Sequence, residues 1–235
     1  MANVAASLET INERIHVACL RSGRAPAGVK LVAVSKTFPV EAIREAVAAG
    51  QRVFGESRQQ EAEPKIAALP ANLEWHFIGR VQRNKVRKLL PMFGVIHAID
   101  SLRLASYVDE VAAECGLFPQ VFLQVNVAGE ASKGGFEPAE LRESLTALLK
   151  LPRLEIIGLM TIPPASPDAE SARPWFIELR NLRDALEREF QVSLPGLSMG
   201  MSGDYEVAVE EGATHVRVGS AIFGARTTRV EGELG

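Results

Sequence analysis

The chain has 235 residues, of which 47% are hydrophobic and 23% are charged, a balance that suits one well-packed domain of barrel size. Its formal net charge of -3 provides no overall field that favours nucleic acid or an anionic membrane. The two cysteines, Cys19 and Cys115, are far apart, which excludes a disulfide framework and a thiolate metal site. The sequence shows no secretory leader and no run of about 18 apolar residues, so we expect a cytoplasmic protein.

The first predicted element is an amphipathic helix within residues 1–24. Val4, Leu8 and Ile11 recur at helical spacing, and Gly23 follows the last apolar position of the pattern. Glycine at that place is typical of a helix C-terminus. The helix precedes the first predicted strand, so we expect it to be an addition to the repeating units that follow.

A strand and a helix come next, and this unit then repeats along the chain. Residues 30–37 form a short β-branched run, and a helical pattern at 40–49 ends at Gly50. The run VFLQV at 121–125 is almost continuously apolar, as expected when protein covers both faces of a parallel sheet. Further strands are predicted at 52–56, 74–79, 95–100, 120–126, 154–162, 194–202 and 215–223.

Eight strand-helix units in about 200 residues predict an α/β fold, specifically a single closed (β/α)8 TIM barrel. A barrel is favoured over an open sheet because closure uses eight equivalent strands and leaves no edge. No helix is predicted after the eighth strand, and we expect the N-terminal helix to fill that gap. We predict a single domain over residues 1–235, with a flexible C-terminal tail at 225–235.

The working face of such a barrel lies where the strands end, and Lys36 is predicted to end the first strand. Alternation places its side chain on the same face as Val32 and Val34. Apolar neighbours lower the pKa of a lysine, and the neutral amine attacks an aldehyde to form a Schiff base. The alternative is a strand-end lysine whose ammonium extends to water.

Small residues after the last two strands suggest a phosphate site. Gly219 and Ser220 follow the eighth strand, and Ser202 and Gly203 follow the seventh. Backbone N–H groups and hydroxyls at these places are suited to bind a phosphate, because loops after the seventh and eighth strands are a recurrent phosphate site in such barrels. Tight turns without a ligand are the alternative. Barrel closure would place this site beside the strand that carries Lys36.

Arg217 lies between Val216 and Val218 in the eighth predicted strand. A guanidinium enclosed in a barrel needs a partner. The sequence leaves two partners open for Arg217, namely an acid such as Glu56 and an acceptor nitrogen on a ligand. Because arginine stays protonated, it would leave a pyridine nitrogen unprotonated and make the ring a weaker electron sink.

Other motifs carry less weight. The four histidines share no ligand spacing, so no metal site is predicted. The five basic residues at 80–88 are interpreted as a solvated helix face, because no aromatic residues interleave with them as in a nucleic-acid surface.

The sequence closely resembles the pyridoxal phosphate homeostasis protein family, also called the YggS or PROSC family. The resemblance runs from the first predicted strand to the last. It lies in LVAVSKT at 31–37, FGES at 54–57, WHFIGRVQRNK at 75–85, GLMTI at 158–162 and SMGMSGDYEVAVEEGATHVRVGSAIFGAR at 198–226.

The resemblance implies a barrel like the N-terminal domain of alanine racemase, the type III fold of pyridoxal 5'-phosphate (PLP) proteins. It implies PLP as a Schiff base on Lys36, with Ser202, Gly219 and Ser220 resembling phosphate contacts and Arg217 resembling the arginine that faces the pyridine nitrogen. The family usually has Gly-Glu-Asn where this chain has Gly55, Glu56 and Ser57, so serine stands here in place of the asparagine.

For function, the family implies a PLP carrier or regulator of cofactor supply in vitamin B6 homeostasis, without established catalytic turnover. We expect a monomer that releases PLP to apo PLP-dependent enzymes. Three alternatives remain open from the residues. They are a PLP-dependent racemase or decarboxylase that uses Lys36 as a base, an aldolase that binds a sugar phosphate through Lys36, and a nucleic-acid binder that uses residues 80–88. A racemase needs a second acid-base group, for which only Tyr107 and Tyr205 are available among the tyrosines.

Overall fold

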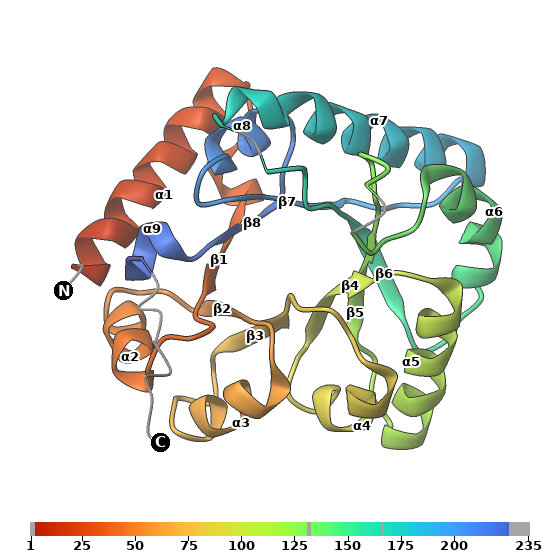
Figure 1. The fold of residues 1–235 in the computed structure, drawn as a ribbon, viewed down its shortest axis with the longest axis horizontal. Coiled ribbons are helices and arrows are strands. Elements are labelled where there is room, and N and C mark those ends of the chain that lie inside the picture. The colour runs from red at the N-terminus through yellow and green to blue at the C-terminus, as the bar shows by residue number, and fades with distance from the viewer. Residues whose placement is uncertain (1–2, 131–132, 166, 226–235) are drawn as a thin grey trace, which may run out of the picture.

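The computed structural model describes residues 3–130, 133–165 and 167–225. Eight parallel strands close into a barrel, with helices around the outside (Figure 1). Each strand pairs with the next along the chain, and the last pairs with the first through the register Lys30 to His215 and Ala33 to Val218. The predicted (β/α)8 barrel is confirmed.

The strands are short, as in most barrels of this type, and the helices vary more in length. The strands are β1 (Lys30–Val34), β2 (Val53–Glu56), β3 (Glu74–Phe77), β4 (Val95–Ile99), β5 (Gln120–Gln124), β6 (Glu155–Met160), β7 (Gly196–Met201) and β8 (His215–Val218). The α-helices are α1 (Val4–Arg21), α2 (Val40–Ala48), α3 (Gln59–Ala67), α4 (Val86–Leu89), α5 (Leu102–Cys115), α6 (Pro138–Leu148), α7 (Arg173–Phe190), α8 (Tyr205–Glu210) and α9 (Ser220–Phe223). Short 3-10 turns occupy η1 (Pro26–Gly28), η2 (Arg83–Lys85) and η3 (Glu170–Ala172).

Seven of the eight strands end one to five residues earlier than predicted, and the first and the last differ most. The first strand ends at Val34 rather than at residues 36–37, because Thr37 adopts a left-handed conformation with φ of 70° and turns the chain. The eighth strand was predicted to run to residue 223, but it ends at Val218 and is followed by α9. The apolar residues of α9 misled the prediction, because short apolar runs occur in buried helices as well as in strands.

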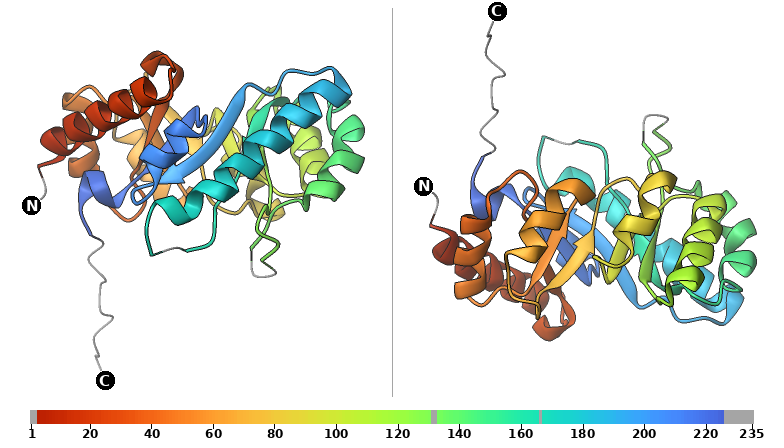
Figure 2. Two further views of the ribbon diagram at one scale, coloured as in Figure 1. Left: turned by 90° about the horizontal axis from the view of Figure 1, so that it is seen from above. Right: turned by 90° about the horizontal axis from the view of Figure 1, so that it is seen from below.

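The N-terminal helix lies over the seam of the barrel, where a full helix after β8 is missing. In Figures 1 and 2, α1 lies alongside α8 and α9, and it also contacts α2. Just after α1, Arg24 donates hydrogen bonds to the carbonyl oxygens of Val209 and Ala213, the second at 2.9 Å. The first and last parts of the chain are therefore packed together.

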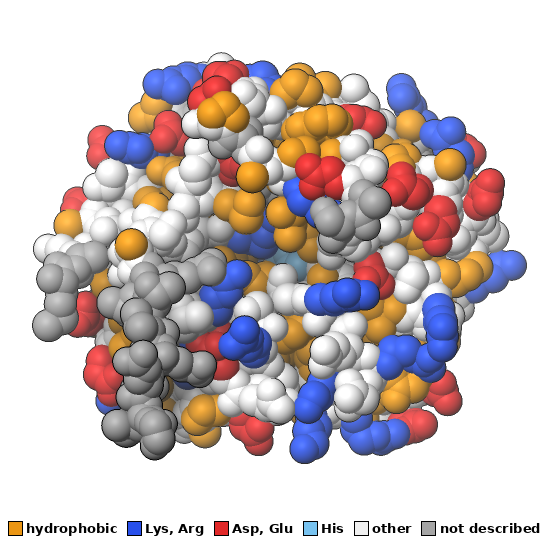
Figure 3. Space-filling view, in the orientation of Figure 1, with side chains coloured by type: hydrophobic (Ala, Val, Ile, Leu, Met, Phe, Trp, Pro, Cys, Tyr) orange, Lys and Arg blue, Asp and Glu red, His pale blue; other side chains and the backbone are white. Residues whose placement is uncertain are grey.

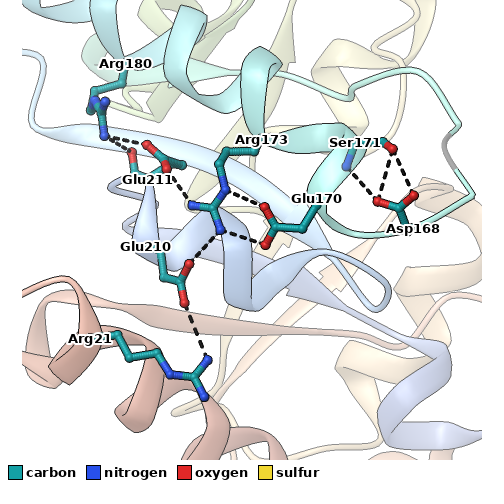
Figure 4. A network of polar contacts seen from close by, with 8 residues as sticks. All are labelled: Arg21, Asp168, Glu170, Ser171, Arg173, Arg180, Glu210 and Glu211. Carbon is teal, nitrogen blue, oxygen red and sulfur yellow. Dashed lines mark hydrogen bonds and ion pairs between the residues drawn. The ribbon is translucent and has the colours of Figure 1, made fainter.

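A network of ion pairs ties the same region to α7 (Figure 4). Arg173 binds Glu210 at 2.8 Å and Glu211 at 2.6 Å, and Arg180 binds Glu211 at 2.7 Å. Arg21 of α1 reaches Glu210 at 3.6 Å. Shared carboxylates connect three helices, and such networks contribute more to stability than isolated surface pairs do.

Apolar side chains on the outside of the strands pack beneath the helices and form the main core. A smaller apolar cluster, made by Val95, Ala98, Phe122 and Met160, is separate from it. Histidines join it, since the His97 and His215 rings lie 4.6 Å and 5.0 Å from that of Phe122. Barrel interiors are normally filled by branched apolar residues, so this polar content calls for an explanation.

Among the helices of the described ranges, none is both long and apolar enough to cross a membrane. Cys19 is buried, Cys115 is half-buried, and both are free thiols. The predicted tail at 225–235 falls outside the described residues except for residue 225.

Candidate functional site

A cavity of about 270 Å³ lies at the ends of β1, β7 and β8. Figure 3 views this face of the barrel, with basic and apolar side chains around its centre and the pale blue of histidine visible within it. All five residues predicted for the site border the cavity, namely Lys36, Ser202, Arg217, Gly219 and Ser220. Gly203, Val34, Phe38, Ile78, Ile162 and Met201 complete its lining.

Lys36 is half-buried and lies two residues beyond the end of β1. It borders the cavity together with Val34, the neighbour on the same face that strand alternation predicts. The alternation of side chains between the two faces therefore continues for two residues past the end of β1. The left-handed Thr37 then turns the chain away.

A buried lysine on α3 holds the backbone just before Lys36. Lys65 is 5% exposed, and its Nζ donates to the Ser35 carbonyl oxygen at 2.9 Å and to Glu56 Oε1 at 2.8 Å. The Ser35 hydroxyl also donates to Glu56 Oε1, at 2.7 Å. The residue that precedes Lys36 is thus fixed through both its carbonyl and its side chain.

The same lysine holds the backbone just after Lys36. Its Nζ lies 2.8 Å from Glu61 Oε1, and that oxygen accepts a hydrogen bond from the Thr37 backbone N–H. Hydrogen bonds from Lys65 and Thr37 outweigh burial and lower the pKa of Glu61. Two carboxylates and one ammonium therefore hold the turn that presents Lys36.

Glu56 is not the partner of Arg217, contrary to one of the two expectations. The carboxylate is fully buried and pairs with Lys65. Burial raises its pKa, and the hydrogen bond from Lys65 opposes that rise. The sequence analysis missed Lys65, which lies on α3. Its spacing from Glu61, four residues earlier on the same helix, was the available signal, whereas its contact with Glu56 of β2 left none.

Two backbone N–H groups meet at one serine beside the cavity. Gly219 N and Ala221 N both donate to Ser202 Oγ, at 3.1 Å and 3.3 Å. The hydroxyl oxygen accepts both bonds, which leaves its own proton to be donated to another group. Ser220 is exposed at the rim of the cavity. We call Ser202, Gly219, Ser220 and Ala221 the cradle.

Arg217 is 5% exposed and borders the floor of the cavity. Its Nη1 donates to Ser198 Oγ at 2.5 Å, and its Nη2 donates to the Thr161 carbonyl oxygen at 2.9 Å. Burial lowers its pKa to about 10, and the nearby Asp204 carboxylate opposes the shift. The guanidinium therefore stays charged near neutral pH, and its five N–H groups exceed the two bonds described.

Three of the four histidines, which share no ligand spacing in the sequence, come together inside the barrel. The His76 and His97 ring centroids are 5.0 Å apart, and each lies 5.9 Å from that of His215. The described residues contain no group of three or more metal-ligating side chains arranged to hold an ion. Their positions on β3, β4 and β8 were readable from the strand pattern, but their hydrogen bonds were not.

The remaining candidates lie away from the cavity lining. Tyr205 is 4% exposed and packs at the start of α8, while the Tyr107 ring lies under Arg83, 4.5 Å from its guanidinium carbon. Ser57 borders a neighbouring cavity of about 310 Å³, with Arg80 and Lys85 of the basic run.

The chain is similar to known proteins over nearly its whole length. The sequence pattern described as alanine racemase, N-terminal domain, matches residues 7–227. The pyridoxal phosphate homeostasis protein of Aquifex aeolicus is 48% identical over 225 residues, covering 95% of this chain and 99% of the relative. The one from Escherichia coli is 41% identical over 241 residues, covering 96% and 98%.

Solved structures agree as well. PipY of Synechococcus elongatus without PLP superimposes with a TM-score of 0.82 at 45% identity, covering 91% of this chain and all of that one. The same protein with PLP bound gives a TM-score of 0.79 at 44% identity, again with 91% and 100% covered. Alanine racemase from Corynebacterium glutamicum shares the fold at 20% identity and a TM-score of 0.70, covering 95% of this chain and 63% of that one. The chain belongs to the pyridoxal phosphate homeostasis protein family.

Proposed function

We propose that this protein binds PLP covalently through Lys36 and serves intracellular PLP homeostasis, without catalytic turnover of its own. The observation that carries the proposal is one cavity bordered by an amine, a hydroxyl-and-amide cradle and a buried guanidinium. Family membership and the PLP-bound structure of PipY support the choice of ligand.

The donor set fits the chemistry of PLP. When bound, PLP supplies an aldehyde that condenses with a primary amine to give an imine and water. Lys36 provides the amine, while the proton of the Ser202 hydroxyl and the exposed Ser220 hydroxyl provide donors for a phosphate. Arg217, with N–H groups beyond its two described bonds, provides a donor for the pyridine nitrogen.

Arg217 also supports the proposal of storage rather than catalysis. A guanidinium with a pKa of about 10 keeps its proton near neutral pH, so a nitrogen that accepts from it stays unprotonated. An unprotonated pyridine ring is a weaker electron sink and gives little help to the loss of an α-proton. Holding PLP requires no such help.

The racemase alternative lacks a second acid-base group in the described residues that border the cavity. Tyr205 is packed at the start of α8, and Tyr107 is held on α5 beneath Arg83. The curated relatives are named for homeostasis, while the shared alanine racemase fold leaves enzymatic activity open. Steady turnover of an amino acid that disappears in Lys36→Ala would decide for an enzyme.

The test is to record the visible spectrum of the protein with PLP, reduce it with borohydride and map the modified peptide by mass spectrometry. We expect the label on the peptide that contains Lys36, and its loss in Lys36→Ala. Lys85→Ala, which removes an amine beside the neighbouring cavity, should keep the label. A label confined to another peptide would contradict the assignment.

We further propose that the protein acts in the cytoplasm as a monomer and passes PLP to apo-enzymes that depend on it. The half-buried Lys36 and the exposed Ser220 make the cavity accessible from outside, as release requires. Light scattering after size-exclusion chromatography tests the monomer. Recovery of activity by an apo-enzyme mixed with the loaded protein, faster than with Lys36-reduced protein, tests the transfer.

A further inference from the structure

A line of hydrogen bonds begins at Arg217 and leads away from the cavity into the barrel. Arg217 Nη1 lies 2.5 Å from Ser198 Oγ, and Ser198 Oγ lies 2.7 Å from His97 Nδ1. Ser198 and His97 are both fully buried. The guanidinium at the cavity floor is therefore connected to a histidine on another strand, β4, through one hydroxyl of β7.

The line continues to the opposite end of the barrel. His97 Nε2 lies 2.8 Å from His76 Nδ1, and His76 Nε2 lies 2.7 Å from Glu74 Oε1. That carboxylate oxygen accepts from Lys30 Nζ at 2.8 Å. The Lys30 and Glu74 side chains are 41% and 40% exposed, so they mark the mouth where β1 and β3 begin.

Only one direction of donation satisfies every bond in this chain, because its two ends are fixed. Arg217 has donors and no acceptor, and an ionised Glu74 has acceptors and no donor. Ser198 Oγ accepts from Arg217 and donates to His97 Nδ1. His97 then donates from Nε2 to His76 Nδ1, and His76 donates from Nε2 to Glu74.

The reverse direction leaves one contact unsatisfied. If His97 carried its proton on Nδ1, its Nε2 would have to accept from His76 Nδ1. A neutral His76 would then present a bare Nε2 to Glu74 Oε1, with two lone pairs 2.7 Å apart. In a buried site this repulsion is costly, so both neutral rings carry their proton on Nε2.

The charges around the rings keep them neutral. Burial lowers the pKa of both His76 and His97, the charge of Lys30 opposes a positive charge on either ring, and the charge of Arg217 opposes one on His97. His215 also faces the two rings, and burial lowers its own pKa to about 3. Glu74 alone favours a proton on His76, and hydrogen bonds from His76 and Lys30 lower the pKa of Glu74 itself to about 2. The carboxylate therefore remains an acceptor throughout the physiological range.

We propose that Ser198, His97 and His76 are positioning residues that, anchored on Glu74, present a polarised hydroxyl oxygen to Arg217 and hold its guanidinium against the cavity. Each bond strengthens the next, since a hydroxyl that donates is a better acceptor. The identity of the ligand that Arg217 faces rests on the proposed function. The hydrogen-bond chain and its direction of donation do not.

The direction is tested in the protein without PLP. Nitrogen-15 chemical shifts of the imidazoles distinguish the Nδ1–H and Nε2–H tautomers of a neutral ring. We expect His76 and His97 to be neutral at pH 7 with the proton on Nε2. A proton on Nδ1 of either ring would overturn the proposal, whether or not the protein binds PLP.

The effect on the cavity is tested with Ser198→Ala, which removes the link between Arg217 and His97. We expect PLP affinity to fall about tenfold or more, as for the loss of one hydrogen bond to a charged group, and the pH profile of the visible band of bound PLP to shift. Ser198→Thr, which keeps the hydroxyl, should restore both. His215→Phe is the matched control, because His215 lies in the same histidine cluster and bonds to Thr214 Oγ1 at 2.9 Å instead of joining the chain.

Equal affinity and an equal pH profile in wild type and Ser198→Ala would overturn the positioning role, and so would an equal loss in His215→Phe. If the wild type binds no PLP, the proposed function fails. The tautomer measurement still tests the direction of donation along the hydrogen bonds from Arg217 to Glu74. Circular dichroism of each variant shows whether the fold is kept, and the wild-type nitrogen-15 shifts need no variant.

Discussion

Gly219 lies directly against Val34, the residue that ends β1. A Cβ built on Gly219 would lie 3.2 Å from the Val34 carbonyl oxygen and 3.3 Å from the Val34 Cβ, closer than such atoms normally approach. The absence of a side chain at position 219 therefore lets the end of β8 approach the strand that leads to Lys36. This approach places the cradle next to the amine.

Gly219→Ala should weaken PLP binding, because the added methyl group moves the cradle away from β1. Overpacking of this size costs about 1 kcal/mol, which corresponds to roughly a fivefold loss of affinity if it falls on the bound state. Absorbance titration with PLP measures it. Gly94→Ala adds the same methyl group in open space and should leave the affinity unchanged; equal affinities in the two variants would contradict the prediction.

Ser202→Ala should reduce PLP affinity about tenfold, since it removes a hydroxyl donor beside the cavity and the acceptor for two backbone N–H groups. Inorganic phosphate should also compete less well for the variant, as read from displacement of bound PLP. Ser171→Ala, which removes a hydroxyl of η3 that binds Asp168 (Figure 4), is the control. Unchanged competition by phosphate in Ser202→Ala would remove this serine from the phosphate site.

Lys65→Met should destabilise the fold by about 3 kcal/mol or more, because it leaves the buried Glu56 carboxylate without its cation. Urea unfolding at pH 7 measures the loss. The double variant Lys65→Met, Glu56→Gln should recover part of it, because no buried charge then remains. Arg87→Met removes an exposed cation paired with Glu114 and should change the unfolding free energy by less than about 1 kcal/mol.

A Lys65→Met protein as stable as the wild type would show that the pair contributes little. The same variant should also bind PLP more weakly, since Lys65 holds the backbone on both sides of Lys36.

The buried histidines should make the fold sensitive to acid. Burial lowers the pKa of His215 to about 3 and also lowers those of His76 and His97, whereas in the unfolded chain a histidine titrates near about 6.5. Below that pH the unfolded state binds protons that the folded state excludes. Stability is therefore full above about 6.5 and falls as the pH drops towards the folded-state values.

Between pH 7 and pH 5 His215, with its pKa of about 3, should lower the unfolding free energy by about 2 kcal/mol, and His76 and His97 should lower it further. Urea unfolding at the two pH values measures the difference. His215→Phe should reduce the difference in unfolding free energy between pH 7 and pH 5 by the contribution of one histidine. His16→Gln, a change at an exposed position of α1, should leave this difference unchanged. Equal stability at pH 7 and pH 5 would contradict the assignment of neutral, buried rings.

Local patterns in the sequence predicted the barrel and the residues around its cavity. Lys36 and Arg217 were identifiable because alternation assigns a strand residue to one face, and barrel closure brings the first and last strands together. Apart from the pair of Glu61 and Lys65 on one helix, the Lys65 cluster and the histidine chain were not predictable, because each joins side chains from several strands or helices. Their contacts depend on barrel stagger and side-chain direction, which no local period encodes.

The packing of α1 against α8 and α9 has a consequence for how the chain folds. Residues 4–21 pack against residues 205–223, so these contacts span almost the whole sequence. During synthesis the first helix emerges long before α8 and α9 exist, and the part of its apolar face that they cover stays exposed until they have left the ribosome. Nascent chains truncated before β8 should consequently remain open and sensitive to protease, and the barrel should close only once β8 and α9 have left the ribosome.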